Sequence, residues 1–142
     1  MGRQAEITLE AFVQPAFCWV DMEWNIEYFL EDHLIYVKTK GVLTAESANL
    51  MVTDVVKAAA FHCCDNQIID HRDTVFALRL FEYYERPEVN SKIGISLKWK
   101  IAMVFKELNS DTFFMETVFR NRGYNFCQFD DVEKARNWIL NK

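Results

Sequence analysis

The stretch HLIYVKTKGVLTAESANLMVTDVVKAAAFHCCDNQIID, residues 33–70, decides the fold. Its first part is rich in β-branched and aromatic residues, which predicts a strand. Thr44 can cap a helix over about 45–62, because its hydroxyl accepts a backbone N–H that lacks a partner in the first turn. The apolar segment QIID then predicts a short buried strand. A strand, a helix and a second strand in this order favour a right-handed crossover between parallel strands.

The same alternation continues on both sides of this stretch. Residues 24–30, WNIEYFL, alternate apolar and polar side chains and predict a strand that pairs with residues 33–39 as a hairpin. Further strands are predicted at KIAMVF and YNFCQF, and helices at 75–93, at about 110–122 and at 130–140. Ser110 or Asp111 would cap the second of these helices and Asp130 the third. Pro87 cannot occupy a helix interior without losing a hydrogen bond, so we expect two helical pieces with a bend near Arg86.

The predicted class is α/β, with a mixed five-stranded sheet in the order β-β-α-β-α-β-α-β-α. Its strands would be mostly parallel, with an antiparallel hairpin at the N-terminal edge. We expect one domain over residues 22–142, a size that buries enough surface for a single core. Residues 1–21 form an extension of uncertain structure, and translation starting at Met22 is an alternative.

That element order and three local motifs resemble the STAS-like fold, in its SpoIIAA-like branch of small bacterial proteins. The motifs are GVLT before the first helix, IID in the strand after it, and FDDVEKARNWIL at the end of the chain. The resemblance covers about residues 22–142. It implies a sheet with helices wound along it and regulation through partner proteins. Relatives that act as anti-sigma antagonists carry a phosphorylated serine in an Asp-Ser-x-x-Gly stretch. The matching region here, DHRDTVFAL, has only the hydroxyl of Thr74, so a switch of that kind is not expected.

One polar block is the candidate binding surface for a partner or ligand, and it comprises Asp70, His71, Arg72, Asp73 and Thr74. Asp70 should end a parallel strand, and the next residues should form the loop that leads to a helix. Such loops line the usual crevice of open α/β sheets. Arg72 could clamp a carboxylate or phosphate, with Thr74 near the positive end of the helix. In the alternative interpretation, Asp73 or Thr74 caps the helix and the rest of the block is solvated.

Composition narrows the classes of partner and the compartment. A net charge of −5 without a cluster of Lys and Arg argues against nucleic acid. The four cysteines lack the spacing of a disulfide scaffold, so reduced thiols in a cytoplasmic protein are expected. No apolar run is long enough to span a membrane. Consecutive His62, Cys63 and Cys64 have diverging side chains, so we expect no metal site there. No cofactor motif is present.

Three functions remain open, in order of preference. The first is a non-catalytic regulatory or protein-interaction module that docks a protein partner through residues 70–76; a homodimer is also plausible. The second is a carrier or sensor of a small, lipid-like apolar ligand in a pocket lined by aromatic rings. The third is an enzyme that uses Asp70, His71 and Asp73 as an acid–base set, and nothing else in the sequence supports it.

Overall fold

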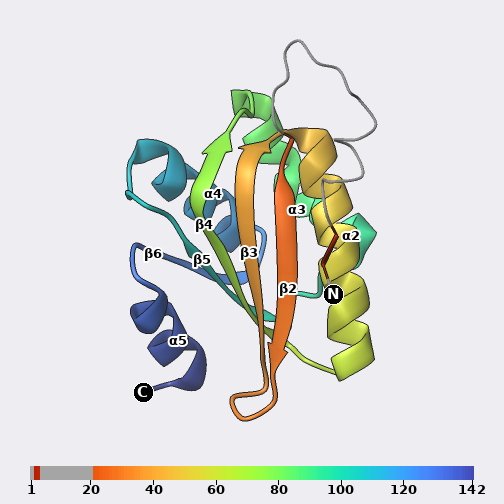
Figure 1. Ribbon diagram of the computed structural model, residues 1–142. Coiled ribbons are helices and arrows are strands. Elements are labelled where there is room, and N and C mark those ends of the chain that lie inside the picture. The colour runs from red at the N-terminus through yellow and green to blue at the C-terminus, as the bar shows by residue number, and fades with distance from the viewer. Residues whose placement is uncertain (1, 4–20) are drawn as a thin grey trace.

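The computed structural model describes residues 2–3 and 21–142 (Figure 1). The elements are β1 (Gly2–Arg3), β2 (Glu23–Phe29), β3 (Leu34–Leu43), α2 (Ala45–His62), β4 (Asn66–Phe76), α3 (Leu80–Ile93), β5 (Lys100–Val104), α4 (Ser110–Asn121), β6 (Asn125–Phe129) and α5 (Val132–Leu140). All the strands and helices predicted from residue 22 onward are present, in the predicted order. The two-residue strand β1, which the sequence did not predict, extends the edge of the sheet. The remaining expectations for the N-terminal extension concern residues that lie outside the described part of the chain.

The sheet follows the chain order β1-β2-β3-β4-β5-β6. Neighbours are antiparallel from β1 to β3 and parallel from β3 to β6, which confirms the predicted mixed sheet with an antiparallel N-terminal edge. Each parallel strand lies next to its predecessor, so the right-handed rule for crossovers places the three connecting helices on one face. Accordingly α2, α3 and α4 share one core, and α5 packs on the opposite face, as Figure 1 shows for α2 and α5.

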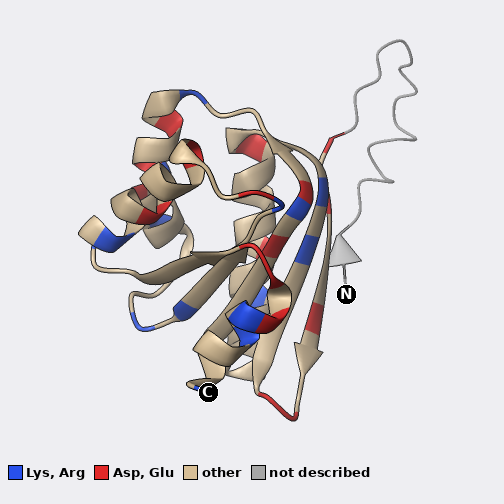
Figure 2. Cartoon of the chain, turned by 90° about the vertical axis from the view of Figure 1, so that its left-hand side faces the viewer, with Lys and Arg blue, Asp and Glu red and all other residues tan. Residues whose placement is uncertain are grey.

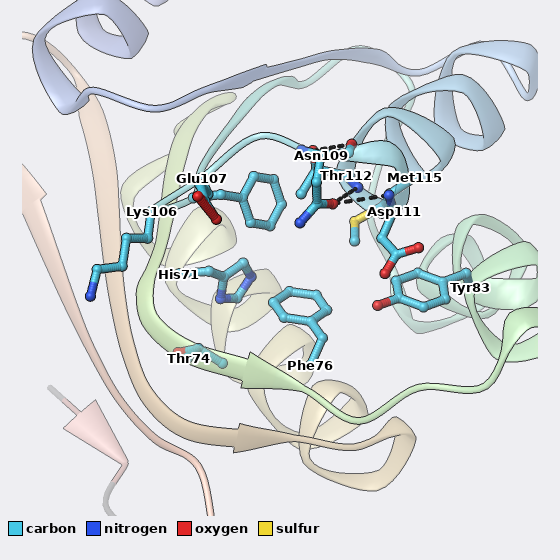
Figure 3. Close-up of a pocket in the computed structure, with 11 residues that line it drawn as sticks. His71, Thr74, Phe76, Tyr83, Lys106, Glu107, Asn109, Asp111, Thr112 and Met115 are labelled. Carbon is cyan, nitrogen blue, oxygen red and sulfur yellow. Dashed lines mark hydrogen bonds between the residues drawn. The ribbon is translucent and has the colours of Figure 1, made fainter.

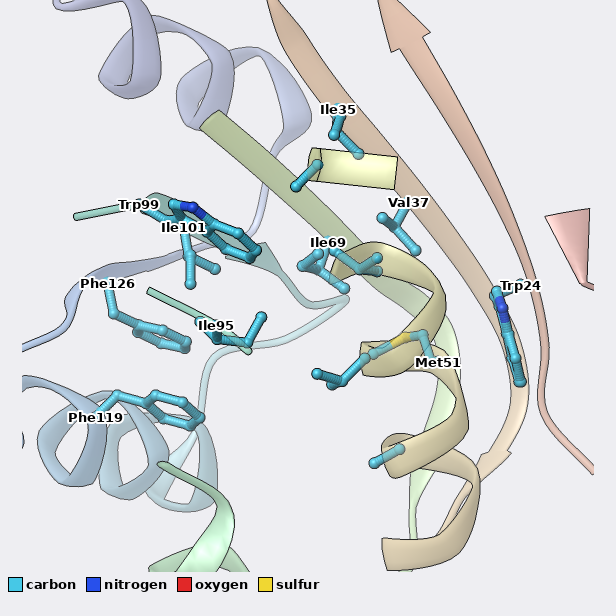
Figure 4. Packing of buried hydrophobic residues seen from close by; sticks show 14 of the residues in the cluster. Trp24, Ile35, Val37, Met51, Ile69, Ile95, Trp99, Ile101, Phe119 and Phe126 are labelled. Carbon is cyan, nitrogen blue, oxygen red and sulfur yellow. The ribbon is translucent and has the colours of Figure 1, made fainter. Parts of the chain in front are cut away.

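The larger core lies between the sheet and the three crossover helices (Figure 4). Phe119 of α4 stacks on Phe126 of β6 with ring centroids 4.6 Å apart. Ile69 of β4 and Met51 of α2 fill the centre of the same layer. Offset aromatic stacking adds a directional term to area burial, so it fixes α4 against the edge of the sheet.

The smaller core lies under α5. Ala135 and Ile139 pack on Ile68, Ala102 and Val104 of the central strands. Because α5 packs mainly on β4, β5 and β6 and reaches β3 only at its start, near Leu34 and Tyr36, most of this face of β2 and β3 has no helix over it in the described part of the chain. Polar side chains of β3 and β4 can therefore reach solvent on that part of the sheet.

Two sequence predictions about the region after the first crossover are wrong. Residues 71–74 are not a loop, because β4 stays paired with β3 as far as the partners Leu43 and Phe76. Neither Asp73 nor Thr74 caps the next helix, since α3 begins at Leu80 with Arg79 at its N-cap.

Pro87 does not divide α3, which is continuous from Leu80 to Ile93. The predicted division into two helical pieces is therefore wrong. The Arg86 guanidinium donates to Asn90 Oδ1 at 2.5 Å, one turn on, and to Asn49 Oδ1 of α2 at 2.8 Å. These buried contacts tie together the turns on either side of the proline.

Helix capping agrees with the sequence at one helix and differs at two. Thr44 caps α2 as predicted, with its hydroxyl accepting from Ser47 N at 3.1 Å. The cap of α4 is Asn109 rather than Ser110 or Asp111, and the cap of α5 is Asp131 rather than Asp130. Among the described helices, none is long and apolar enough to cross a membrane.

Gly41 of β3 is held by a close approach of the chain before β2. Its φ is +114°, and a Cβ there would lie 2.5 Å from the Asp21 carbonyl oxygen. Gly123 also has a positive φ, +93°, but a Cβ there would meet only Leu97 at 3.7 Å. A comparison of alanine substitutions at the two positions therefore distinguishes the cost of backbone strain, which both share, from the cost of steric overlap, which only Gly41 has.

We expect Gly41→Ala to lower the free energy of unfolding more than Gly123→Ala does. The Gly123 variant carries only the strain of a positive φ, about 1–2 kcal/mol. The Gly41 variant adds an overlap with backbone, which should cost at least about 1 kcal/mol more. Urea denaturation of both variants measures the difference, and equal losses would contradict the close approach.

Candidate functional site

The polar block lies inside the central strand β4, where alternation divides it between the two faces of the sheet and the register is irregular. Lys38 pairs with Asp70, whereas Lys40 pairs with Asp73, so β4 has one residue more than β3 over this interval. This is the geometry of a β-bulge. Ordinary alternation places Asp70 and Arg72 on the face that carries α5 and His71 on the face of the three crossover helices, and the extra residue brings Thr74 to the same face as His71.

Asp70 is completely buried and is surrounded by donors. Its carboxylate accepts from Arg72 Nε at 2.9 Å, from Arg72 Nη2 at 2.8 Å and from the Arg72 backbone N–H at 3.1 Å. The Tyr36 hydroxyl and Lys38 Nζ contact the same group. Figure 2 shows acidic and basic positions side by side on the neighbouring strands of this face.

This network keeps Asp70 ionised. Burial alone would raise the pKa of the carboxyl, but the hydrogen bonds from Arg72 and Tyr36 outweigh it and lower the pKa to about 2. Burial and the bond to Asp70 raise the pKa of Tyr36 to about 12. Asp70 also raises the pKa of Arg72. Arg72 is thus engaged in a bidentate pair with Asp70, so its fork is not free to clamp a ligand.

His71 is buried on the opposite face and held by hydroxyl groups. Thr39 Oγ1 lies 2.7 Å from His71 Nδ1, 2.5 Å from Thr74 Oγ1 and 3.2 Å from the carbonyl oxygen of Asp70. A hydroxyl has one proton, and a carbonyl oxygen can only accept. When Thr39 donates to that carbonyl, Nδ1 and Thr74 must both donate to Thr39. His71 is then protonated on Nδ1, and Nε2 carries a free lone pair.

The imidazole is neutral at physiological pH. Burial disfavours its charged form and lowers the pKa of His71 to about 3, although the charge of Asp70 opposes this. Phe76 and Phe105 flank the ring, with centroids 4.9 Å and 6.0 Å from it. Nε2 is buried and has no hydrogen-bond partner among the described residues.

His71 forms part of the wall of a pocket of about 260 Å³ (Figure 3). The pocket lies where β4 and β5 end, between the sheet and helices α3 and α4. It is lined by His71, Thr74, Phe76, Tyr83, Phe105, Lys106, Glu107, Asn109, Asp111, Thr112 and Met115. The side chains combine aromatic rings with polar groups, which is the usual composition of a small-molecule site.

The structure brings together only part of the predicted block. His71 and Thr74 share the pocket, Asp70 and Arg72 lie behind the sheet, and the exposed Asp73 carboxylate pairs with Lys38 Nζ at 3.1 Å. Sequence reasoning missed the pocket residues contributed by α3 and by the loop after β5. The sequence contained one signal for the residues after β5. The apolar segment KIAMVF predicts a central parallel strand, and neighbouring parallel strands end at the same edge of a sheet, so the residues that follow it should lie near the end of β4.

A second cavity, of about 340 Å³, lies between the hairpin and α5. Phe29, Leu34, Tyr36 and Ile68 give it an apolar lining, and the ion pair between Arg136 and Asp32 lies at its edge with a 2.7 Å contact. In residues 21–142, no group of three His, Cys, Asp or Glu side chains is placed to hold a metal ion. Cys63, Cys64 and Cys127 are free thiols.

Comparison with known proteins supports the fold. The chain is similar in structure to an uncharacterised protein of the DUF3478 family from Shewanella loihica PV-4, which has a SpoIIAA-like fold. The TM-score is 0.56 at 18% identity, and the match covers 89% of this chain and 98% of that one. No protein-family model and no curated protein matches the sequence. The STAS-like resemblance seen in the sequence is thereby confirmed at the level of fold.

We expect Asp70→Asn to destabilise the protein by about 2 kcal/mol at neutral pH. A carboxyl with a lowered folded pKa stabilises the protein above its unfolded pKa of about 3.9, and this stabilisation is lost as the pH falls toward 2. The difference between wild type and variant in urea denaturation should therefore shrink between about pH 4 and pH 2. Asp73→Asn is the control, because its carboxylate is 56% exposed and should matter little. A pH-independent difference for Asp70→Asn would count against the network.

The tautomer of His71 is open to direct measurement. We expect ¹⁵N NMR to show Nδ1 protonated and Nε2 unprotonated, with no titration between about pH 5 and pH 8, because the ring is buried. Thr39→Val removes the hydroxyl that fixes the tautomer and should shift the ring signals, whereas Thr39→Ser retains the hydroxyl and should not. A ring that titrates near pH 6 would refute this geometry.

Proposed function

We propose that this STAS-like domain of SpoIIAA-like fold is a non-catalytic regulatory module that senses a small molecule in the His71 pocket. One observation carries the proposal: a neutral, buried imidazole in the pocket wall has a ring nitrogen without a hydrogen-bond partner in the described part of the chain. An unsatisfied buried polar atom costs about 1–3 kcal/mol, so such an atom calls for an explanation. A ligand that donates a hydrogen bond to Nε2 would remove this cost.

The position of the pocket supports the same interpretation. It lies beyond the carboxyl ends of parallel strands β4 and β5, which is where open α/β sheets bind ligands. Three different elements contribute side chains, namely β4, α3 and α4. Small shifts of these elements relative to one another would therefore change the fit of a ligand, which is what a sensor requires.

The geometry argues for binding rather than acid–base catalysis. The sheet separates Asp70 from the imidazole of His71, so the carboxylate cannot orient that ring as a catalytic partner would. Asp73 is engaged with Lys38. A histidine whose pKa is about 3 is a weak base, and it is poorly matched to proton transfer near neutral pH. These observations support the proposal that the chain is not an enzyme.

A regulatory role needs a surface that responds to the ligand, and α3 offers one. Tyr83 lines the pocket, whereas Leu80, Phe81 and Tyr84 of the same helix expose 72%, 51% and 57% of their surface. Exposed apolar side chains gathered on one helix favour contact with another protein. Binding of a protein partner there, and homodimer formation, remain predictions. The originally predicted docking surface at residues 70–76 retains only Asp73 and Val75 as exposed parts of β4.

A lipid-like apolar ligand fits the His71 pocket less well than a polar one. Its small volume and its polar side chains from His71, Thr74, Asn109 and Asp111 support a ligand with a polar group. The cavity beside α5 is more apolar, but the described residues that line it offer no buried, unpaired polar atom.

The test is a fragment screen by NMR that follows the His71 ring and the Met115 methyl group. We expect polar fragments to shift both signals in the wild type, and His71→Phe to abolish the Met115 shift because it keeps a ring but removes Nε2. His62→Phe is the matched control, because His62 stacks on Tyr28 at the end of α2, and Phe can keep that stacking. Circular dichroism verifies that each variant is folded. If no fragment shifts either signal, or if His71→Phe binds normally, the proposal fails.

A further inference from the structure

The side chains around the His71 pocket select the charge of the ligand. We infer that the ligand is a small organic cation, an amine carried on a short apolar body; this inference rests on the proposed function. Three independent features lead to it: the hydrogen-bond character of the lining, the sign of the nearby charges, and the aromatic walls.

The hydrogen-bond character of the buried imidazole in the lining depends on where Thr39 donates its proton. When Thr39 donates to the Asp70 carbonyl, His71 Nε2 carries a lone pair and the Thr74 proton points toward Thr39 and away from the pocket. A ligand must therefore bring an N–H or O–H donor to Nε2. A carboxylate or a fully ionised phosphate monoester has no proton to donate there, so it would leave Nε2 unsatisfied.

The nearby charges favour a cation. Glu107 and Asp111 line the pocket, and Lys106 is the one positively charged residue among the described lining residues. Figure 3 shows the Lys106 side chain extending away from the imidazole. Two effects raise the pKa of the Tyr83 phenol: burial, which is the larger, and the negative charge of Asp111. The Asp111 charge therefore acts on a group that lines the pocket.

The start of helix α4 does not offer an anion site. The Asn109 side chain already accepts from the backbone N–H groups of Asp111 and Thr112, at 2.9 Å and 3.1 Å. These are the donors that an anion at a helix N-terminus would use. An anionic ligand would have to displace this cap and approach two carboxylates.

Aromatic rings form the apolar part of the wall. The ring centroid of Phe76 lies 6.4 Å from that of Tyr83, with parallel ring planes, and 5.8 Å from that of Phe105. The negative faces of such rings attract ammonium groups, and several rings together form the aromatic cages that bind methylated amines. A volume of about 260 Å³ limits the ligand to a small amine.

The experiment compares probes that share a body and differ in head group. One series is 2-phenylethylamine, 2-phenylethanol and phenylacetate, and the other is butylamine, butanol and butyrate. Affinities are measured by NMR titration on the His71 and Met115 signals of the full chain. We expect each amine to bind about tenfold more tightly than its alcohol, through the added charge and ring contacts, and the carboxylates not to bind.

Two variants assign the preference to the pocket. Asp111→Asn should weaken amine binding about threefold to tenfold and leave alcohol binding unchanged, because it removes one partly solvated charge. Asp65→Asn is the control with the same change in net charge, since Asp65 lies before β4 at the opposite end of the strand. It should leave both affinities unchanged.

The two proposals fail in different ways. If none of the six probes shifts His71 or Met115, the pocket does not bind small molecules and the proposed function falls together with the inference. If an alcohol or a carboxylate binds as tightly as its amine, the proposed function stands and the cation is refuted. The cation is also refuted if Asp111→Asn leaves amine binding unchanged.

Discussion

The hydroxyl group of Thr39 on β3 contacts the backbone of Asp70 and the side chains of His71 and Thr74 on β4. Thr39 is fully buried, and its one proton must serve the Asp70 carbonyl, His71 and Thr74. When that proton goes to the Asp70 carbonyl, Nδ1 of His71 must carry the hydrogen of the ring. The polarity of the pocket wall therefore follows from a hydrogen-bond requirement in the adjacent strand, as well as from the side chains that face the cavity.

The bulge in β4 brings Thr74 to the side of the sheet that carries His71 and Thr39. Strict alternation alone places Asp70 and His71 on opposite faces, so the polar run divides its charged and neutral groups between the two sides of the sheet. On one face the carboxylate of Asp70 is matched by Arg72 and Tyr36. On the other, the imidazole stays neutral. A rigid charged network behind the pocket holds the backbone that positions His71.

The two faces of the sheet differ in how far helices cover them. Three consecutive right-handed crossovers place α2, α3 and α4 over one face, and α3 and α4 enclose the His71 pocket against β4. The single helix α5 leaves the hairpin side of the other face open in the described structure, where the ladder of charges lies. Because α3 contributes Tyr83 to the pocket and apolar side chains to the surface, it is the element through which an occupied pocket could alter an outer surface.

The sequence by itself determined the order of strands and helices, the mixed sheet and the SpoIIAA-like fold, because apolar periodicity and caps such as Thr44 are local signals. It also pointed to the block around His71. Only the tertiary structure decided that this block stays in a strand, that α3 runs through Pro87, and that Asp70 and His71 lie on opposite faces. Those outcomes depend on ladder partners and packing contacts from distant residues, such as Leu43 opposite Phe76 and Asn49 against Arg86. No short window of sequence contains both members of such a pair.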